Sequence, residues 1–225
     1  MTIKGLIFDF DGLILDTELP EFQVWEDIYK SYGLKIPLDM WLKTIGTKNE
    51  SFDVFSYLEN NVGNIILDRH KIICQQKSLF DKKMKTQRVR PGVKNYIKDA
   101  KNRDLKIAIA SSSPFDWLEK YLTGLDVLDS FDIIVTSNDV KNVKPSPDLY
   151  NLALQKLNIK APEAISFEDS YNGILAAKSA DIFCVAVPNG ITSHMNLDIA
   201  DMIITSLESI ELDQIIQYFY NQSIA

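Results

Sequence analysis

The feature that most constrains this chain is an apolar segment near its start that ends abruptly in acidic residues. The continuous apolar run Leu6–Phe8 is followed by Asp9 and Asp11, which are separated by one residue. Because side chains alternate between the two faces of a strand, the two carboxylates are expected on the same side. Two such groups at the end of a buried strand are costly unless a cation or a reaction uses them. An Asp-Gly pair between apolar runs is also a strong hairpin signal, so these residues alone leave both interpretations open.

The rest of the chain alternates between short apolar segments and segments of helical period. Further strands are expected at residues 105–110, 131–135, 164–167, 182–187 and 202–204. Continuous apolar runs, in place of an apolar-polar alternation, are typical of strands that are buried on both faces. Strands that alternate with helices predict an α/β fold, in which a doubly wound, Rossmann-like parallel sheet is covered by helices on both faces.

One long segment departs from this alternation. Every predicted element between the first strand and the second α/β unit is helical, and the last and longest of these helices places Ile66 and Ile73 on its inward face. We therefore predict an α/β core formed by residues 1–16 and 88–225, with an inserted α-helical domain at residues 17–87.

Composition argues against several classes of partner. The net charge is −7 and there is no Lys/Arg cluster, whereas nucleic-acid binding needs a basic surface. No apolar run approaches the roughly 20 residues of a membrane span, and Asp9 precedes any signal-peptide core. Cys74 and Cys184 are too few and too distant for a disulfide framework or a zinc site, so both are expected as buried, small hydrophobic residues. A cytoplasmic, monomeric protein fits these properties.

Polar residues follow several of the predicted strands, at the ends where a doubly wound sheet binds its ligands. They are Asp9, Asp11, Ser111, Lys144, Glu168 and Asp169. Taken singly, each has a structural explanation, such as complementing a helix N-terminus or lying in a solvated loop. Taken together, they would place carboxylates, a lysine and a serine at the same edge of the predicted sheet. This concentration of negative charge indicates a bound divalent cation. Ligation by oxygen alone suits Mg²⁺.

This combination of residues indicates phosphoryl transfer. A carboxylate beside Mg²⁺ can attack a phosphoryl group and form an aspartyl-phosphate. Backbone amides and the hydroxyl of Ser111, at a predicted helix N-terminus, can hold the phosphoryl oxygens. Lys144 would supply a second positive charge as charge shifts in the transition state.

Four motifs, in this order, resemble the signature of the haloacid dehalogenase superfamily. They are Asp9-Phe10-Asp11-Gly12, then Ser111, then Lys144-Pro145, then Glu168-Asp169-Ser170. The continuation through Asp16-Thr17-Glu18 is similar to the branch that contains β-phosphoglucomutase and sugar-phosphate phosphatases. The helical insert resembles the small α-helical cap of that branch.

The resemblance implies a role for each motif. The implied catalytic residues are Asp9, Asp11 and Lys144. The implied phosphate-binding residues are Ser111, Ser112 and Lys144, and the implied ligands of Mg²⁺ are Asp9, Asp11, Glu168 and Asp169. In these roles Asp9 is the nucleophile, Asp11 protonates the leaving oxygen and later activates water, and Lys144 orients Asp9. The Asp11 ligand to the metal would be its backbone carbonyl.

Two further features concern the reaction and the substrate. Mutases of this branch have a histidine shortly after the Asp-Thr pair, where this chain has Glu21, so a phosphatase is favoured over a β-phosphoglucomutase-like isomerase. Lys48 stands in the place of the family's substrate-specificity loop, where it could bind substrate or simply be solvated. We expect a Mg²⁺-dependent phosphatase for a small phosphorylated metabolite, such as a sugar or polyol phosphate. The isomerase and a non-catalytic interaction protein remain as alternatives.

Overall fold

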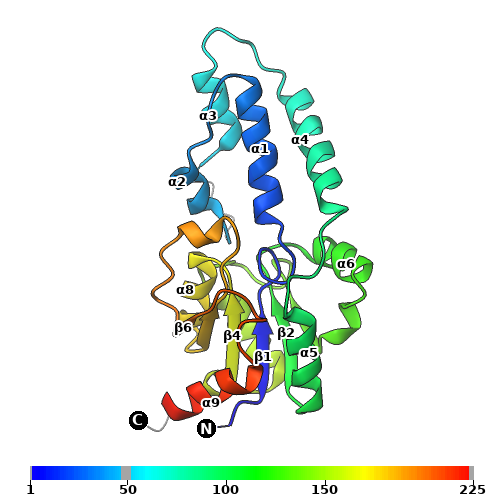
Figure 1. Ribbon diagram of the computed structural model, residues 1–225, viewed down its shortest axis with the longest axis vertical. Coiled ribbons are helices and arrows are strands. Elements are labelled where there is room, and N and C mark those ends of the chain that lie inside the picture. Colours follow the sequence, from blue (N-terminus) through cyan, green and yellow to red (C-terminus); the bar gives the residue numbers. More distant parts are fainter. Residues whose placement is uncertain (1, 47–51, 223–225) are drawn as a thin grey trace.

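The computed structural model describes residues 2–46 and 52–222. Figure 1 shows an elongated molecule, with a sheet and its flanking helices at one end and a separate group of helices at the other. None of the described helices is both long enough and apolar enough to cross a bilayer.

The sheet has the doubly wound arrangement that the sequence predicts. Within residues 2–46 and 52–222, six strands pair in parallel in the order β3-β2-β1-β4-β5-β6. Their bounds are β1 Gly5–Phe8, β2 Lys106–Ala110, β3 Ile133–Val135, β4 Ala164–Glu168, β5 Phe183–Ala186 and β6 Met202–Ile203. Because β2 and β4 flank β1 on opposite sides, the strand order reverses at the C-terminal end of β1, which is where ligands bind in such sheets.

The helices form two groups. The bounds of those around the sheet are α5 Val93–Asn102, α6 Phe115–Gly124, α7 Asp148–Leu157, α8 Tyr171–Ser179 and α9 Leu212–Gln222. The bounds of those in the insert are α1 Glu18–Ser31, α2 Leu38–Trp41, α3 Val54–Asn61 and α4 Arg69–Met84. Short 3₁₀ helices are η1 Leu42–Thr44, η2 Leu128–Ser130, η3 Ala161–Glu163 and η4 Thr192–His194.

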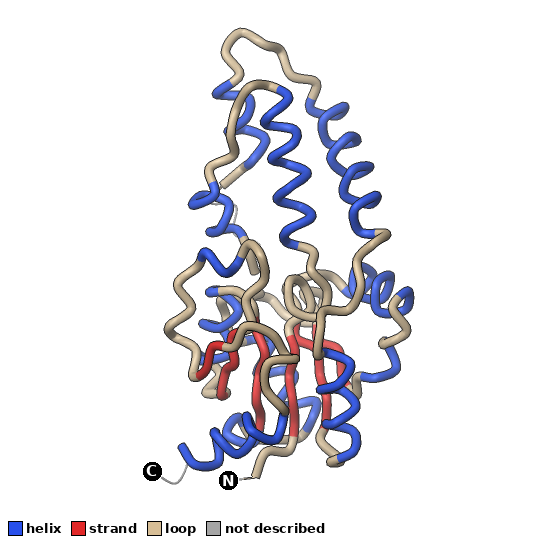
Figure 2. Tube along the Cα trace, in the orientation of Figure 1, coloured by secondary structure: helices blue, strands red, loops and turns tan. Residues whose placement is uncertain are grey.

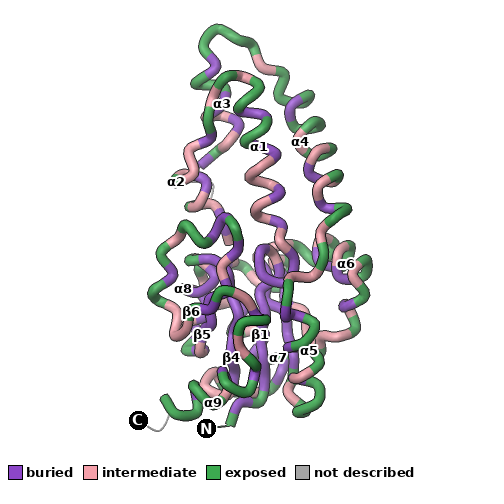
Figure 3. Tube along the Cα trace, in the orientation of Figure 1, coloured by how far each residue is buried: buried purple, intermediate pink, exposed green. Residues whose placement is uncertain are grey.

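Both faces of the sheet are buried, as the continuous apolar strands predict. Ile7 belongs to one buried cluster with residues of α7 and α8, whereas Leu6 and Phe8 belong to another with residues of α5, α6 and α9. Figure 3 shows the central strands β1 and β4 buried and the surrounding helices exposed on their outer sides, and every residue of β1 and β4 is buried. Alternate side chains of β1 therefore pack into the two buried clusters, one on each face of the sheet. This packing on both faces places the end of β1 in the middle of the core.

Helices α1–α4 form a lobe of their own above the sheet (Figure 2). Within it, α1 packs against α4. The two chain segments that join this lobe to the core lie together, because Leu15 and Val89 form an antiparallel bridge. We propose this lobe, residues 17–87, as a cap over the end of the sheet.

Two expectations about α4 and its surroundings are wrong. The helix begins at Arg69, because the Asp68 side chain accepts a hydrogen bond from the Lys71 N–H (3.0 Å) and caps it there. Ile66 consequently lies before the helix, with 97% of its surface exposed. Ile73 is also exposed, because the buried face of α4 passes through its neighbour Ile72.

Of the two cysteines, only Cys184 is buried as expected. Cys74 is exposed, because it lies one turn after His70 on the outer side of α4.

Candidate active site

The site begins at the turn that follows β1. Asp9 continues the strand direction, donating its N–H to the Phe167 carbonyl (3.0 Å), and the chain then reverses at Gly12, which has φ +86°. The Gly12 N–H donates to the Leu15 carbonyl (2.7 Å), which closes a tight loop instead of a hairpin. A side chain at Gly12 would overlap Asp169, so only glycine allows this turn to lie against the end of β4.

A buried ion-pair cluster lies beside this turn. Lys144 Nζ donates to Asp9 Oδ1 and to Glu168 Oε1 (2.6 Å for the latter), and all three side chains are buried. Tyr150 of α7 donates its hydroxyl to the same Glu168 oxygen (2.6 Å). Burial lowers the pKa of Lys144, but Asp9 and Glu168 outweigh this effect and raise it above its usual value. The ammonium group therefore stays charged and pairs with two carboxylates.

A third buried carboxylate makes this cluster suitable for a metal ion. Oxygen atoms of Asp9, Glu168 and Asp169 lie within 4.8 Å of one another. Burial raises the pKa of Asp9 to about 8, although Lys144 opposes this shift and Glu168 adds to it. Burial and then Asp9 likewise raise the pKa of Asp169 well above its usual value. Lys144 alone therefore does not keep all three groups ionised. An all-oxygen donor set of this kind fits a hard divalent cation, which would favour the carboxylate forms.

The Asp11 side chain lies outside this group of three and is held by four hydrogen bonds. Its Oδ1 accepts from the Thr17 hydroxyl (3.1 Å) and from the indole Nε1–H of Trp117 (2.8 Å). Its Oδ2 accepts from the hydroxyls of Ser113 (2.6 Å) and Ser111 (3.4 Å). The structure thus joins Ser111 to Asp11, and it adds Ser113 and Trp117, which the sequence analysis did not identify as site residues.

Two more supporting side chains were missed. Asn189 Nδ2 donates to Asp169 Oδ2 (2.8 Å) and to the Gly12 carbonyl (3.2 Å). Arg90 donates to the same carbonyl and to two carbonyls that follow β5. In the sequence, Arg90 stands out only as the residue before a Pro-Gly turn and Asn189 only as part of an Asn-Gly turn. Neither pattern indicates a site.

A pocket of about 360 Å³ opens beside Asp9 and Asp11 and is lined by residues of both the core and the cap. From the cap, α1 contributes Glu18 and Glu21, and α2 contributes Trp41. Burial, and after it Asp11, raises the pKa of Glu21 to about 7, and burial with neighbouring carboxylates raises the pKa of Glu18 well above its usual value. The Nε1–H of Trp41 is buried and has no hydrogen-bond partner among the described residues. The cap side of the pocket thus offers two carboxyl groups, from Glu18 and Glu21.

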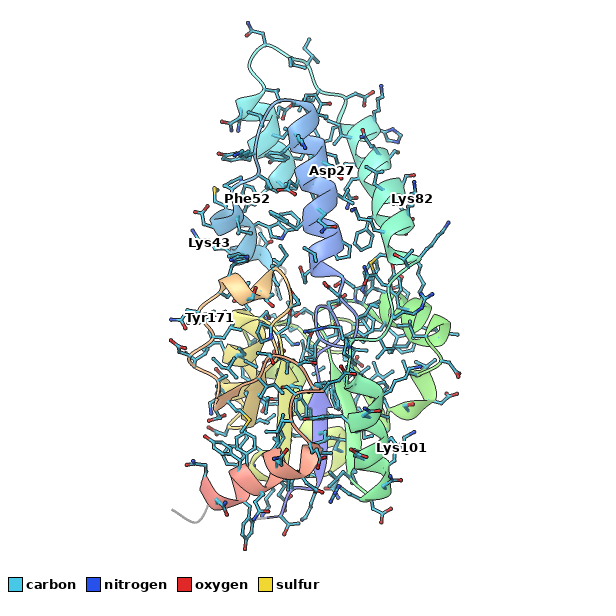
Figure 4. All side chains as sticks on the ribbon, in the orientation of Figure 1. Asp27, Lys43, Phe52, Lys82, Lys101 and Tyr171 are labelled. Carbon is cyan, nitrogen blue, oxygen red and sulfur yellow. The ribbon has the colours of Figure 1, made fainter. Side chains whose placement is uncertain are left out.

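The cap reaches the core through a loop that follows η1. Ser112 donates its hydroxyl to the Gly46 carbonyl (3.1 Å), and Asn172 Nδ2 donates to the Ile45 carbonyl (2.8 Å). Ser112 therefore contacts the cap beside the pocket, and its binding of phosphate stays a prediction. Lys48 lies outside the described residues. In Figure 4, Lys43 of the cap and Tyr171 of the core lie on the same edge of the molecule, and Lys82 of α4 lies on the opposite edge.

Packing around Glu168 leads to a prediction about two helical glycines. A Cβ at Gly173, in α8, would overlap the Glu168 carboxylate, whereas a Cβ at Gly124, in α6, would meet nothing within 4 Å. Alanine is usually better than glycine in a helix by about 1 kcal/mol. We expect Gly124→Ala to stabilise the protein by up to that amount. Gly173→Ala should instead destabilise it by about 2–3 kcal/mol and reduce activity, because Glu168 must move.

Denaturant unfolding of both variants, with activity assays, checks this prediction. A Gly173→Ala protein that is more stable than the wild type and fully active would contradict the packing described here.

Comparison with known proteins supports an enzymatic site. A model of the family described as haloacid dehalogenase-like hydrolase matches residues 6–187. The chain is 40% identical to YhcW of Bacillus subtilis (strain 168), a protein named provisionally as a phosphatase, over 98% of this chain and 100% of that protein. It is 31% identical to the phosphorylated carbohydrates phosphatase of Thermotoga maritima, over 80% and 82% of the two chains. A crystal structure of β-phosphoglucomutase from Clostridium difficile is similar with a TM-score of 0.76 at 26% identity, over 99% of each chain.

Proposed function

The chain belongs to the haloacid dehalogenase-like hydrolase family, as its motifs predict, and on this basis we propose that it is a Mg²⁺-dependent phosphatase of small phosphomonoesters. One observation carries the proposal. Lys144 binds the Asp9 carboxylate, which lies close to the buried carboxylates of Glu168 and Asp169 and also lines an open pocket. Such an arrangement presents a carboxylate nucleophile next to positive charge, which is what an attack on an anionic phosphoryl group needs.

The residues of the site divide the reaction between them. Asp9 attacks phosphorus, the bond to the leaving oxygen breaks, and Asp11 gives its proton to that oxygen. Asp11 then takes a proton from water, which attacks the aspartyl-phosphate and releases phosphate and Asp9. Lys144 keeps the Asp9 carboxylate oriented, and Ser111 holds a phosphoryl oxygen. When bound, Mg²⁺ would be held by the side chains of Asp9, Glu168 and Asp169 and the backbone carbonyl of Asp11, and would neutralise phosphoryl charge.

The cap side of the pocket supports a sugar or polyol phosphate as the substrate. Carboxyl groups at Glu18 and Glu21 line the pocket and can accept hydrogen bonds from hydroxyl groups. When it is ionised, Glu21 also opposes a second phosphate or carboxylate on the substrate. The similarity to a phosphatase of phosphorylated carbohydrates agrees with this choice. We retain cytoplasmic location, a monomer and the absence of a nucleic-acid partner as parts of the proposal.

A β-phosphoglucomutase-like isomerase is the second candidate, and it is supported by the likeness to the Clostridium difficile structure. Against it stands Glu21, at the position where those mutases have a histidine. A carboxyl group there gives no evident means of delaying hydrolysis of the aspartyl-phosphate.

One assay tests the function and the role of Glu21 together. Wild type and Glu21→Gln are given polyol phosphates, hexose phosphates, sugar bisphosphates and nucleotides, with Mg²⁺ or with EDTA, and phosphate release is measured. We expect hydrolysis only with Mg²⁺, and a preference of about 10-fold for esters with one phosphate group over bisphosphates. Because the pKa of Glu21 is about 7, this preference should grow as pH rises through 7 and Glu21 becomes anionic. Glu21→Gln should remove that pH dependence.

Two outcomes would contradict these expectations. Formation of glucose 6-phosphate from β-glucose 1-phosphate faster than phosphate release would favour the isomerase. An unchanged pH dependence in Glu21→Gln would show that this carboxyl group does not select the substrate.

A further inference from the structure

We infer that Trp117 is a positioning residue that decides which oxygen of Asp11 carries the catalytic proton and that links this choice to the cap. The inference rests on the proposed phosphatase reaction, in which Asp11 is the general acid. Trp117 lies in α6, near its start, and lines the pocket. It is not one of the residues implied by the family motifs.

The first observation is the chemistry of the donors around Asp11. Trp117 Nε1–H and the Thr17 hydroxyl both donate to Oδ1, and the hydroxyls of Ser111 and Ser113 donate to Oδ2. A hydroxyl group can rotate and accept a hydrogen bond instead, but an indole N–H can only donate. Oδ1 therefore cannot carry a proton toward Trp117, whereas Oδ2 can carry one toward a serine.

This asymmetry assigns the proton. A proton on Oδ1 could point only at the Thr17 hydroxyl, and it would turn Oδ1 into a hydroxyl oxygen, which is a weaker acceptor for the Trp117 N–H. The bond to Trp117 therefore favours the proton on Oδ2 when Asp11 is protonated for catalysis. The indole thus holds Oδ1 as an acceptor and leaves Oδ2, on the Ser111 side, as the oxygen that delivers the proton. Ser111 is also the residue proposed to bind the phosphoryl group, so the proton would lie on the side of the substrate.

The second observation is that the Trp117 ring is packed against the cap. Phe80 of α4 stacks on it, with ring centroids 5.9 Å apart and planes at 23°. Next to this pair, Asp81 of α4 approaches Lys120 of α6, with 3.5 Å between Oδ1 and Nζ. Figure 1 shows the lower end of α4 leading to the region of α6. A movement of α4 must therefore displace the ring that holds Asp11, which couples the position of the cap to the general acid.

Substrates with different leaving groups distinguish a positioning role of Trp117 from a purely structural role. An alkyl phosphate, such as a sugar phosphate, has a poor leaving oxygen and needs the proton from Asp11. An aryl phosphate, such as 4-nitrophenyl phosphate, leaves without much protonation. The value of kcat/KM includes steps up to formation of the aspartyl-phosphate only. The ratio of kcat/KM for the two esters, measured on one preparation, also cancels any loss of folded protein.

The experiment compares three variants with the wild type. Trp117→Phe keeps a ring for Phe80 but removes the N–H, and Phe80→Leu keeps the N–H but removes the stack. We expect Trp117→Phe to lower the alkyl/aryl ratio by about 10-fold and Phe80→Leu to lower it by about 3-fold. Tyr121→Phe is the control, because Tyr121 also touches the Trp117 ring (centroids 4.8 Å apart) but is not bonded to Asp11. It should leave the ratio unchanged.

Any result other than those expected would contradict a part of the inference. Equal losses on both esters in Trp117→Phe would make Trp117 structural, and an unchanged ratio in Phe80→Leu would break the link to the cap. In an Asp11→Asn background, Trp117→Phe should cause no further change in the ratio, and a further change would mean that Trp117 acts through another group. Failure of the proposed function itself would differ from all of these, because the wild type would then hydrolyse neither ester.

Discussion

Asp9→Asn abolishes hydrolysis of every phosphomonoester, with an expected loss in kcat of at least ~10⁴-fold. The amide has the same shape as the carboxylate but is not a nucleophile, so no aspartyl-phosphate can form. The fold should survive, because Lys144 keeps its second partner, Glu168, at 2.6 Å. Phosphate release in the presence of Mg²⁺ measures the effect, and thermal unfolding shows whether the variant is folded.

A matched control for this change is Asp27→Asn, at an exposed position on α1 (Figure 4). It should keep the full rate of the wild type. If a folded Asp9→Asn protein keeps even a tenth of that rate, Asp9 is not the nucleophile.

Lys144→Met has the second large expected effect, which is on stability as well as on activity. The Lys144 side chain is 1% exposed and compensates Asp9 and Glu168, which are 8% and 0% exposed. Removing one partner of a buried ion pair leaves uncompensated charge, so the free energy of unfolding in EDTA should fall by about 3–5 kcal/mol. Mg²⁺ should restore part of this loss, because a dication bound to the same carboxylates replaces the missing charge.

Lys178→Met is the control for Lys144→Met. Lys178 pairs with Asp201 at 2.6 Å, but these side chains are 34% and 27% exposed, and a pair of that kind contributes about 0–1 kcal/mol. Denaturant titrations of both variants, with Mg²⁺ and with EDTA, compare the two pairs. Equal losses for the two variants, or no effect of Mg²⁺ on Lys144→Met, would contradict the charge balance proposed for the site.

The fold could be predicted from the sequence because its strands are continuous apolar runs. A continuous apolar run that is short and bounded by turn residues indicates a strand buried on both faces. In a chain of 225 residues, strands of this kind that alternate with helices indicate a parallel sheet. The inward face of α4 could not be predicted as well. Its apolar residues are sparse, and the Asp68 cap that sets the start of the helix was not recognised, so Ile73 was assigned to the core in place of Ile72.

The residues of the site likewise include some that could be predicted from the sequence and some that could not. Asp9, Lys144, Glu168 and Asp169 could be brought together because each ends or follows a strand, and parallel strands end at one edge. The partners of Asp11 could not, because Trp117 comes from the exposed start of a helix and looks like an ordinary amphipathic position. Arg90 and Asn189 both donate to the Gly12 carbonyl, and Asn189 also donates to Asp169, which is distant in the sequence. Contacts of that kind depend on how loops fold over the sheet, and no local pattern encodes them.

The proposed reaction depends on an aspartyl-phosphate at Asp9, and this intermediate can be trapped chemically. Wild-type enzyme is mixed with substrate and Mg²⁺, quenched in acid during turnover and treated with borohydride, which reduces an acyl phosphate to an alcohol. Peptide mapping by mass spectrometry then locates the reduced residue. We expect homoserine at position 9, and only when substrate is present. Homoserine at another carboxylate, or steady turnover with none at position 9, would contradict it.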